Sequence, residues 1–225
     1  ESYAFGFPKD QSVNHGYLAV DFFYALSGFV IGYAYDDRWD RMSLCDFFKR
    51  RLIRLHPMSI IGTINGFCFI ILQQQSKIFP LLDKIEPIKF FIHLLMALFM
   101  IPCPISLDIR GWGETNAFNS TTWTLQYEYL ANILYAFIIR FLNNILVGIF
   151  TFIGSLLTII LVFDLDFLNI LTGREEQKYT VIGGWKLSLS QIVIAFIRLI
   201  YPFFSGYLLY RFKIKINIKY GFFIC

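Results

Sequence analysis

The sequence predicts an all-α fold, a polytopic bundle of transmembrane helices. Of its 225 residues, 56% are hydrophobic and only 16% are charged, whereas a soluble domain carries about 45–50% apolar and about 25% charged residues. The apolar residues gather in continuous runs, and a membrane-spanning helix needs about 20 such residues. These runs lack the apolar–polar alternation of a membrane β-barrel, so we expect helices, which satisfy their own backbone groups in lipid.

Six apolar runs predict about six spans, and residues 1–225 are expected to form a single membrane domain. The runs cover Tyr17–Tyr35, Leu55–Leu72, Ile88–Cys103, Thr122–Phe141, Ile145–Phe163 and Ile192–Tyr210. The third run is short and is bounded by Pro87, Pro102 and Pro104. Because the residue before a proline disfavours the helical region, the ends of this run are poorly defined.

Both ends of the chain look truncated. Glu1–Asn14 is polar and lacks the cationic start and apolar run of a signal peptide. The first residue is not Met, and Gly221–Cys225 begins a new apolar run. We therefore expect a domain truncated at both ends.

The distribution of basic residues predicts which side of the membrane each loop occupies. Asp36–Arg54 is the densest basic segment, with Arg38, Arg41, Lys49, Arg50, Arg51 and Arg54. The positive-inside rule makes this segment cytoplasmic. Strict alternation through six spans then puts the basic segment Arg211–Lys219 outside, against the same rule. One predicted span must therefore be re-entrant or miscounted, and we expect Ile88–Cys103 to be that segment.

Several kinds of site are not indicated. The four cysteines, Cys45, Cys68, Cys103 and Cys225, are scattered without ligand spacing, so we expect no metal site and no permanently bound cofactor. The sequence lacks a phosphate-binding glycine loop, HExxH and GxSxG. Nothing in it favours nucleic-acid binding.

Glu128 is an ionisable residue within a predicted span. Such residues cost about 2.5–3.5 kcal/mol to insert and mark function by default. In a helix from Thr122, Glu128 shares a face with Thr124 and Asn132, four residues to either side. This polar stripe suggests a hydrated cavity, and an inter-helix hydrogen-bond network is the alternative. In either case Glu128 is expected to face the interior of the bundle.

Arg51 and Arg54 lie three residues apart, one helical turn. Their guanidinium groups could converge on one anion, and arginine suits bidentate phosphate binding. A cytoplasmic, phosphate-bearing donor such as coenzyme A would fit. The alternative is a basic anchor for anionic lipid head groups.

Arg198 is the one charged residue of its predicted span, and it can be either an interfacial anchor or a cavity residue. His93 lies in an apolar run, which superficially suits a buried general base. A lone histidine without a patterned partner is more often structural.

Four blocks of sequence resemble the acyltransferase-3 family of membrane O-acyltransferases. They are GYLAVDFFYALSGFVI at 16–31, FFKRRLIRLHP at 47–57, NSTTWTLQYE at 119–128, and Gly184-Trp185 with Arg198 and Phe203–Gly206. The third block has Thr124 where the family usually has Ser. The blocks stand in the family's order and cover most of the chain.

The resemblance implies a membrane enzyme of about ten spans that moves an acyl group, often acetyl, from acyl-CoA to a hydroxyl of a carbohydrate or lipid-linked glycan. Acyl-CoA would be a co-substrate, with Arg51 and Arg54 as its binding residues. Trp123, Asn132 and Arg198 would belong to the substrate cavity. We expect the protein in a membrane, a bacterial inner (plasma) membrane, with lipid, acyl-CoA and a glycan or lipid-linked acceptor as partners.

The family's catalytic histidine lies upstream of the 16–31 block, so we expect this chain to lack it, and His15 does not match its position. Glu128 is then the catalytic candidate, orienting that base or binding the acceptor. Two alternatives are a transporter-like polytopic protein and a non-catalytic membrane fragment. Transporters tend to have two repeated halves with broken helices, and no repeat is evident here.

Overall fold

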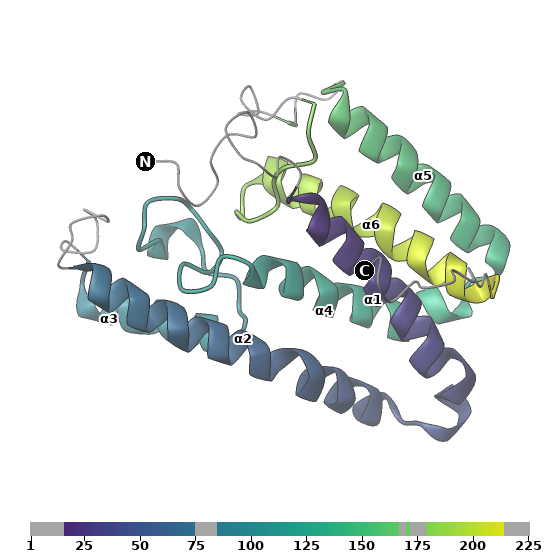
Figure 1. Cartoon of the computed structure of the whole chain (residues 1–225), viewed down its shortest axis with the longest axis horizontal. Coiled ribbons are helices and arrows are strands. Elements are labelled where there is room, and N and C mark those ends of the chain that lie inside the picture. Colours follow the sequence, from purple (N-terminus) through teal and green to yellow (C-terminus); the bar gives the residue numbers. More distant parts are fainter. Residues whose placement is uncertain (1–15, 75–84, 167–169, 172–178, 214–225) are drawn as a thin grey trace, which may run out of the picture.

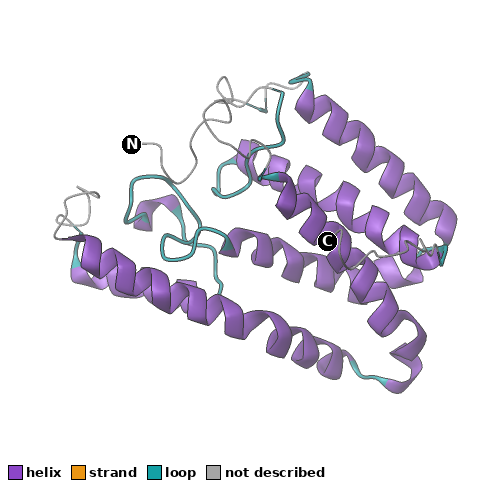
Figure 2. Ribbon diagram, viewed as in Figure 1, coloured by secondary structure: helices purple, strands orange, loops and turns teal. Residues whose placement is uncertain are grey.

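The chain folds into a bundle of α-helices in the computed structural model, which describes residues 16–74, 85–166, 170–171 and 179–213 (Figures 1 and 2). The helices are α1 (Leu18–Tyr35), α2 (Leu44–Gln74), α3 (Pro87–Leu98), α4 (Thr122–Phe137), α5 (Asn144–Val162) and α6 (Leu189–Arg211). Short 3-10 turns follow α1 (η2, Asp36–Arg41), precede α4 (η4, Ile105–Leu107) and follow α4 (η5, Ile139–Phe141). Within the described ranges there is no strand, and the all-α prediction is confirmed.

The predicted number of spans needs correction. Among the described residues, four helical segments are long and apolar enough to cross a membrane, Leu18–Arg41, Leu44–Gln73, Asn144–Val162 and Leu189–Arg211. Helix α3 has 12 residues and α4 has 16, lengths of roughly 18 and 24 Å at 1.5 Å per residue. Both fall short of a hydrocarbon core about 30 Å thick. The expectation of six spans was therefore too high for these two segments.

The outer surface of the bundle is rich in apolar side chains. Large apolar residues on α2 and α5 are exposed in the isolated chain, among them Ile53, Phe69, Leu72, Ile145 and Phe152. Water would not tolerate such a continuous apolar surface on a monomer, whereas lipid tails would. The four long apolar helices and this surface identify an integral membrane protein.

Helices α1 and α6 run parallel to each other and pack at very close range. A Cβ atom added at Gly28 would overlap the backbone carbonyl of Phe203, and one at Gly206 would overlap that of Ala25. Glycine on each helix thus lets the two backbones touch. This is the small-residue packing typical of membrane helices, whose association in lipid is driven by close packing and not by the hydrophobic effect.

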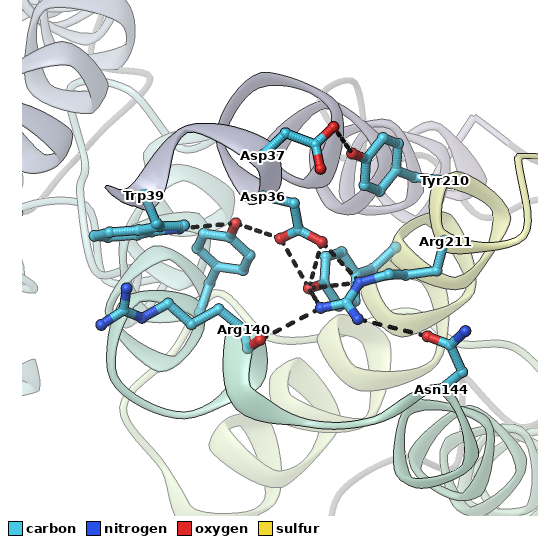
Figure 3. A network of polar contacts seen from close by, with 9 residues as sticks. Asp36, Asp37, Trp39, Arg140, Asn144, Tyr210 and Arg211 are labelled. Carbon is cyan, nitrogen blue, oxygen red and sulfur yellow. Dashed lines mark hydrogen bonds and ion pairs between the residues drawn. The ribbon is translucent and has the colours of Figure 1, made fainter. Parts of the chain in front are cut away.

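At one end of the bundle, an aspartate at the end of α1 connects three other segments (Figure 3). The Asp36 carboxylate accepts hydrogen bonds from Tyr135 of α4 at 2.6 Å and from Tyr207 of α6 at 3.0 Å. Arg211 pairs with Asp36 at 2.7 Å and donates to the Arg140 carbonyl at 3.4 Å. These residues are called the Asp36 cluster.

The Asp36 cluster resolves the conflict in the predicted topology. Arg211 and the basic segment that begins at Asp36 lie at the same end of the bundle. The conflict came from counting Ile88–Cys103 and Thr122–Phe141 as two crossings, whereas α3 and α4 together return the chain only once to the end that holds Asp36, where α4 ends and α5 begins. This end, called the basic end below, is the one that the positive-inside rule predicts to be cytoplasmic.

His93 of α3 holds the long loop that precedes α4. Its Nδ1 lies 3.0 Å from the Leu107 carbonyl and its Nε2 accepts the backbone N–H of Ala117 at 3.0 Å. The carbonyl needs a donor, so His93 is neutral with its proton on Nδ1. A Cβ at Gly66 of α2 would overlap the Phe118 carbonyl, which shows how closely this loop lies against α2. Helix α4 consequently starts beside the middle of α2, where Ser59 and Thr122 are in contact.

Candidate functional site

Four polar residues from three helices meet in the middle of the bundle. Arg51 of α2 donates from Nη2 to Glu128 Oε1 at 2.8 Å and from Nε to Asn132 Oδ1 at 3.0 Å. Ser27 of α1 donates to the same oxygen of Glu128 at 2.9 Å. Ser27, Arg51, Glu128 and Asn132 are called the Glu128 cluster. Glu128 and Asn132 lie on one face of α4, as their spacing of four predicts.

The Glu128 cluster is almost completely shielded from solvent, and part of its hydrogen-bonding capacity is unused. Arg51 is 0% exposed and Glu128 is 2% exposed. Among the described residues, Glu128 Oε2, Arg51 Nη1 and Asn132 Nδ2 have no hydrogen-bond partner. Buried polar atoms are nearly always paired, and exceptions often mark catalytic or binding positions. The prediction that Glu128 faces the interior is confirmed.

A cavity of about 220 Å³ lies beside Glu128, between α1, α2 and α4. Its polar wall is formed by Ser27, Arg54 and Glu128, and its apolar wall by Phe23, Leu26, Leu55, Met58 and Leu125. Glu128 thus lines the cavity, meets Arg51 through one oxygen and has a second oxygen without a hydrogen-bond partner. We take this cavity and the Glu128 cluster as the candidate site.

The two arginines of the predicted phosphate site are in different environments. Arg51 is buried and engaged with Glu128 and Asn132, while Arg54 is exposed and lines the cavity. The sequence suggested two free guanidinium groups converging on one anion. In the structure, the Arg54 side chain is accessible to a ligand, whereas Arg51 has only its Nη1 without a hydrogen-bond partner. The assignment of both to donor binding stays a prediction.

Arg198 and Trp123 form a second buried cluster, farther from the basic end. Arg198 Nε lies 3.0 Å from Asp21 Oδ1, and the guanidinium lies 5.5 Å from the centre of the Trp123 ring. Arg198 also donates to the Tyr17 carbonyl at 2.6 Å and to the Gly183 carbonyl at 3.2 Å. At 3% exposure, Arg198 faces the interior and is not an interfacial anchor. Neither Arg198 nor Trp123 lines the cavity beside Glu128, and their roles toward substrate stay predictions.

A second cavity, larger than the one beside Glu128, has a different character. It measures about 440 Å³ and opens at the basic end, lined among others by Asp36, Asp37, Arg140 and Arg211. Asp36 and Arg211 are committed to each other and to Tyr207 (Figure 3). This cavity therefore borders the Asp36 cluster, whose charged groups are already paired. Its greater size does not make it the better candidate for a functional site.

Neither described histidine lines the cavity beside Glu128, and His56 lies partly exposed on α2. Both ring nitrogens of His93 are used in holding the loop before α4, which favours the structural interpretation. His15 lies outside the described residues. The described residues also contain no group of three or more His, Cys, Asp or Glu side chains that could hold a metal ion.

Sequence reasoning missed two partners of the predicted residues. Asp21, which pairs with Arg198, is an ionisable residue inside a predicted span and could have been singled out on that ground. Ser27, the second donor to Glu128, carries no comparable signal, because serine is common in membrane helices.

Comparisons with known proteins agree with the sequence blocks. The family model described as an acyltransferase domain, of the acyltransferase-3 type, matches residues 2–224. A curated relative, protein 2 in the picA locus of Rhizobium radiobacter, is 31% identical over 126 residues. That alignment covers 53% of this chain and 64% of the relative, so the chain spans less than two thirds of the relative's length. No solved structure shows significant similarity to the chain.

Proposed function

The chain belongs to the acyltransferase-3 family, and from that premise we propose that it forms the donor side of a membrane O-acyltransferase. The enzyme would move an acyl group, acetyl in the simplest case, from acyl-CoA to a hydroxyl of a carbohydrate or lipid-linked glycan. Its place would be a bacterial inner membrane, with coenzyme A on the cytoplasmic side. The family and the four long apolar helices support a membrane protein, and the donor, acceptor and compartment are our proposals.

One observation carries the proposal: a buried carboxylate that lines a cavity is held through one oxygen by an arginine, while its other oxygen has no hydrogen-bond partner. Isolating a charge in this way is costly unless it is paired. Arg51 and Ser27 hold Glu128 Oε1 in place. Oε2 stays available to accept a hydrogen bond from a ligand group that brings an N–H or O–H into the cavity. A purely structural pair would be expected to use both oxygens.

In the reaction, an acceptor O–H loses its proton to a general base while its oxygen attacks the thioester carbonyl carbon. The new C–O ester bond forms, the C–S bond breaks, and coenzyme A leaves as a thiolate that takes up a proton. The family resemblance assigns the base to a histidine upstream of residue 16. Glu128 would accept a hydrogen bond from that imidazole or from the acceptor hydroxyl, and so orient the group that reacts.

Arg54 is the residue we assign to the donor's phosphates. It is exposed, lines the cavity, and lies one helical turn from Arg51 on α2. The phosphates would stay toward the basic end while the thioester reaches Glu128. Arg51 would keep Glu128 ionised and fixed, with Nη1 as its remaining donor.

The test compares wild-type protein with a Glu128→Gln variant. Membranes from cells that express the intact protein are incubated with radiolabelled acetyl-CoA, and label is counted in glycan and lipid fractions. Glutamine keeps the volume but removes the charge, so transfer should fall about 100-fold or more, a usual scale for acid–base support. Met96→Leu, a change on α3 away from the site, is the control and should keep its activity. Equal transfer by the Gln variant, or no transfer by wild type, would refute the proposal.

A further inference from the structure

The cavity of about 440 Å³ at the basic end is surrounded by charged side chains of both signs. Its walls come from η2, η5, the end of α6 and the residues just after α6. They carry three carboxylates and three cationic groups, Asp36, Asp37, Asp40, Arg140, Arg211 and Lys213. The formal charge of the lining is therefore zero, and a ligand is not attracted to this cavity merely because it is an anion.

Arg140 is held in place by aromatic rings. Its guanidinium carbon lies 4.0 Å from the centre of the Trp39 ring and 4.2 Å from the centre of the Phe141 ring. Figure 3 shows the side chain extending toward Trp39 and away from Arg211. Among the described residues, no carboxylate pairs with Arg140, and its buried Nε has no hydrogen-bond partner. Arg140 thus presents free N–H donors in a fixed plane, which suits a phosphate group.

Asp37 and Asp40 lie on one edge of η2, because residues three apart in a 3-10 helix lie directly above one another. Both side chains are exposed and line the cavity. Within the described ranges, the Asp37 carboxylate accepts one hydrogen bond, from the Tyr210 hydroxyl at 3.3 Å, and the Asp40 carboxylate accepts none. Two such carboxylates on one edge suit a cation with several N–H donors, such as a primary ammonium group.

The cavity lies beside apolar side chains that face lipid. Phe141 lines the cavity and is 69% exposed, Phe212 is 57% exposed, and Ile145 at the start of α5 is 73% exposed. The start of α5 borders the cavity, because Arg211 reaches Asn144 at 3.5 Å. Aromatic and basic residues gather at the level of the lipid head groups. The alkyl chains of a lipid bound here would lie along these exposed apolar side chains.

We propose that this cavity binds the head group of a zwitterionic phospholipid with a phosphodiester and a primary ammonium, as in phosphatidylethanolamine. The phosphate would lie against Arg140 and Lys213, and the ammonium against Asp37 and Asp40. Four covalent bonds of about 1.5 Å join phosphorus to nitrogen in an ethanolamine head group, so the two charges are about 5 Å apart. The inference requires only that the protein spans a membrane, and it does not depend on the proposed acyl transfer.

The lining discriminates against other lipid head groups. A purely anionic head group, such as that of phosphatidylglycerol, would bring a phosphate to Arg140 but no cation to Asp37 and Asp40. A choline head group has a positive charge but no N–H to donate to a carboxylate. Quaternary ammonium groups bind instead over aromatic rings, and Arg140 already occupies that position on Trp39 and Phe141.

The experiment measures dissociation constants of the purified intact protein in detergent, by native mass spectrometry. The three lipids have identical acyl chains and an ethanolamine, glycerol or choline head group. Wild type should bind the ethanolamine lipid about tenfold more tightly than either of the others, the scale of one hydrogen bond to a charged group. Arg140→Gln should weaken binding of the ethanolamine lipid about tenfold or more, because the phosphate loses charged donors.

A second variant tests the other half of the head group. Asp37→Asn combined with Asp40→Asn should weaken binding of the ethanolamine lipid about tenfold or more, because the ammonium loses both carboxylates. Binding of the glycerol lipid should stay the same or improve in this double variant. Both positions are exposed, so the double variant provides a test even if Arg140→Gln does not fold. The SDS unfolding midpoint of each variant reports its folding.

The matched control is Arg38→Gln. Arg38 belongs to η2 and is exposed, but it does not line the cavity. The change removes one positive charge from the basic end and should leave all three dissociation constants unchanged.

A soluble head group shows whether the occupant is a lipid. Glycerophosphoethanolamine has the same charged groups without alkyl chains, and it should bind wild type about 100-fold more weakly, the effect of about three or four buried CH₂ groups. Equally tight binding of this soluble compound would overturn the lipid as occupant. Displacement of the ethanolamine lipid by free coenzyme A would also overturn it, because the cavity would then belong to the donor site.

The remaining outcomes concern charge. Equal binding of the three lipids, or tightest binding of the glycerol or choline lipid, would overturn the inference. An effect of Arg38→Gln as large as that of Arg140→Gln would do the same, because lipid would then be attracted only by the general charge of the basic end. None of these results bears on acyl transfer, so the proposed function would stand.

Discussion

Replacing Arg51 by Met should strongly destabilise the protein, because it leaves Glu128 as an unpaired buried charge. Met has a similar length but removes the donor that lies 2.8 Å from Glu128 Oε1 and the one that lies 3.0 Å from Asn132. Both partners of the ion pair are at most 3% exposed at their side chains. Breaking one side of such a buried pair costs about 3–5 kcal/mol.

The size of this effect can be separated from the net contribution of the pair. In the double variant Arg51→Met, Glu128→Leu no buried charge is left unpaired, and replacement of a buried ion pair by apolar residues is often near neutral or stabilising. The double variant should therefore recover most of the loss. The coupling energy between the two positions should reach several kcal/mol, beyond the 0.5–3 kcal/mol usual for residues in contact.

The assay is equilibrium unfolding in mixed micelles with increasing SDS, followed by helical circular dichroism. The matched control is Lys89→Met, because Lys89 and Glu86 form a pair at 3.8 Å whose side chains are 48% and 65% exposed. An exposed pair contributes about 0–1 kcal/mol. If Arg51→Met were as mild as Lys89→Met, or if the double variant showed the sum of the single losses, the buried ion pair would not have the role assigned to it.

Three further variants test other parts of the fold and the donor site. Gly206→Ala should lower the free energy of unfolding by about 1–3 kcal/mol, because the added methyl group forces α1 and α6 apart. The control is Gly148→Ala on α5, where an added Cβ meets nothing within 4 Å; it should leave the free energy of unfolding unchanged or raise it by up to about 1 kcal/mol. Equal SDS midpoints for the two variants would contradict this. Burial lowers the pKa of His93 below its usual value of 6.5, so the folded state binds a proton at His93 more weakly than the unfolded chain does. The stability that neutral His93 contributes is therefore fully present above about pH 6.5 and is lost as the pH falls below that value. His93→Leu should lose stability at neutral pH and show a flatter pH profile, and a profile identical to that of wild type would exclude His93 as its source. Arg54→Lys should raise the dissociation constant for acetyl-CoA about tenfold, since an ammonium cannot reproduce a bidentate fork, and calorimetry that shows no change would leave Arg54 as a lipid anchor.

Much of the secondary structure follows from composition and periodicity. Long apolar runs such as Ile145–Phe163 predict helices with small boundary errors, and α5 was found at Asn144–Val162. The error in the number of spans arose where the chain is apolar but short. Helix α3 ends at Leu98, before Met100, which adopts a positive φ of 56°, and before Pro102 and Pro104. A hydropathy pattern does not show that such a segment turns back and is held there by His93.

The sequence by itself determined that Glu128 is inside the bundle, because a carboxylate in a membrane helix is too costly to face lipid. It also determined the family, through blocks of residues that recur in order. Only the tertiary structure decided the partner of Glu128. The spacing of Arg51 and Arg54 does not distinguish one from the other, but the orientation of α2 against α1 and α4 buries Arg51 and leaves Arg54 exposed. Which face of a helix meets which neighbour depends on contacts between segments 77 to 101 residues apart, such as Arg51–Glu128 and Ser27–Glu128, and no local pattern encodes it.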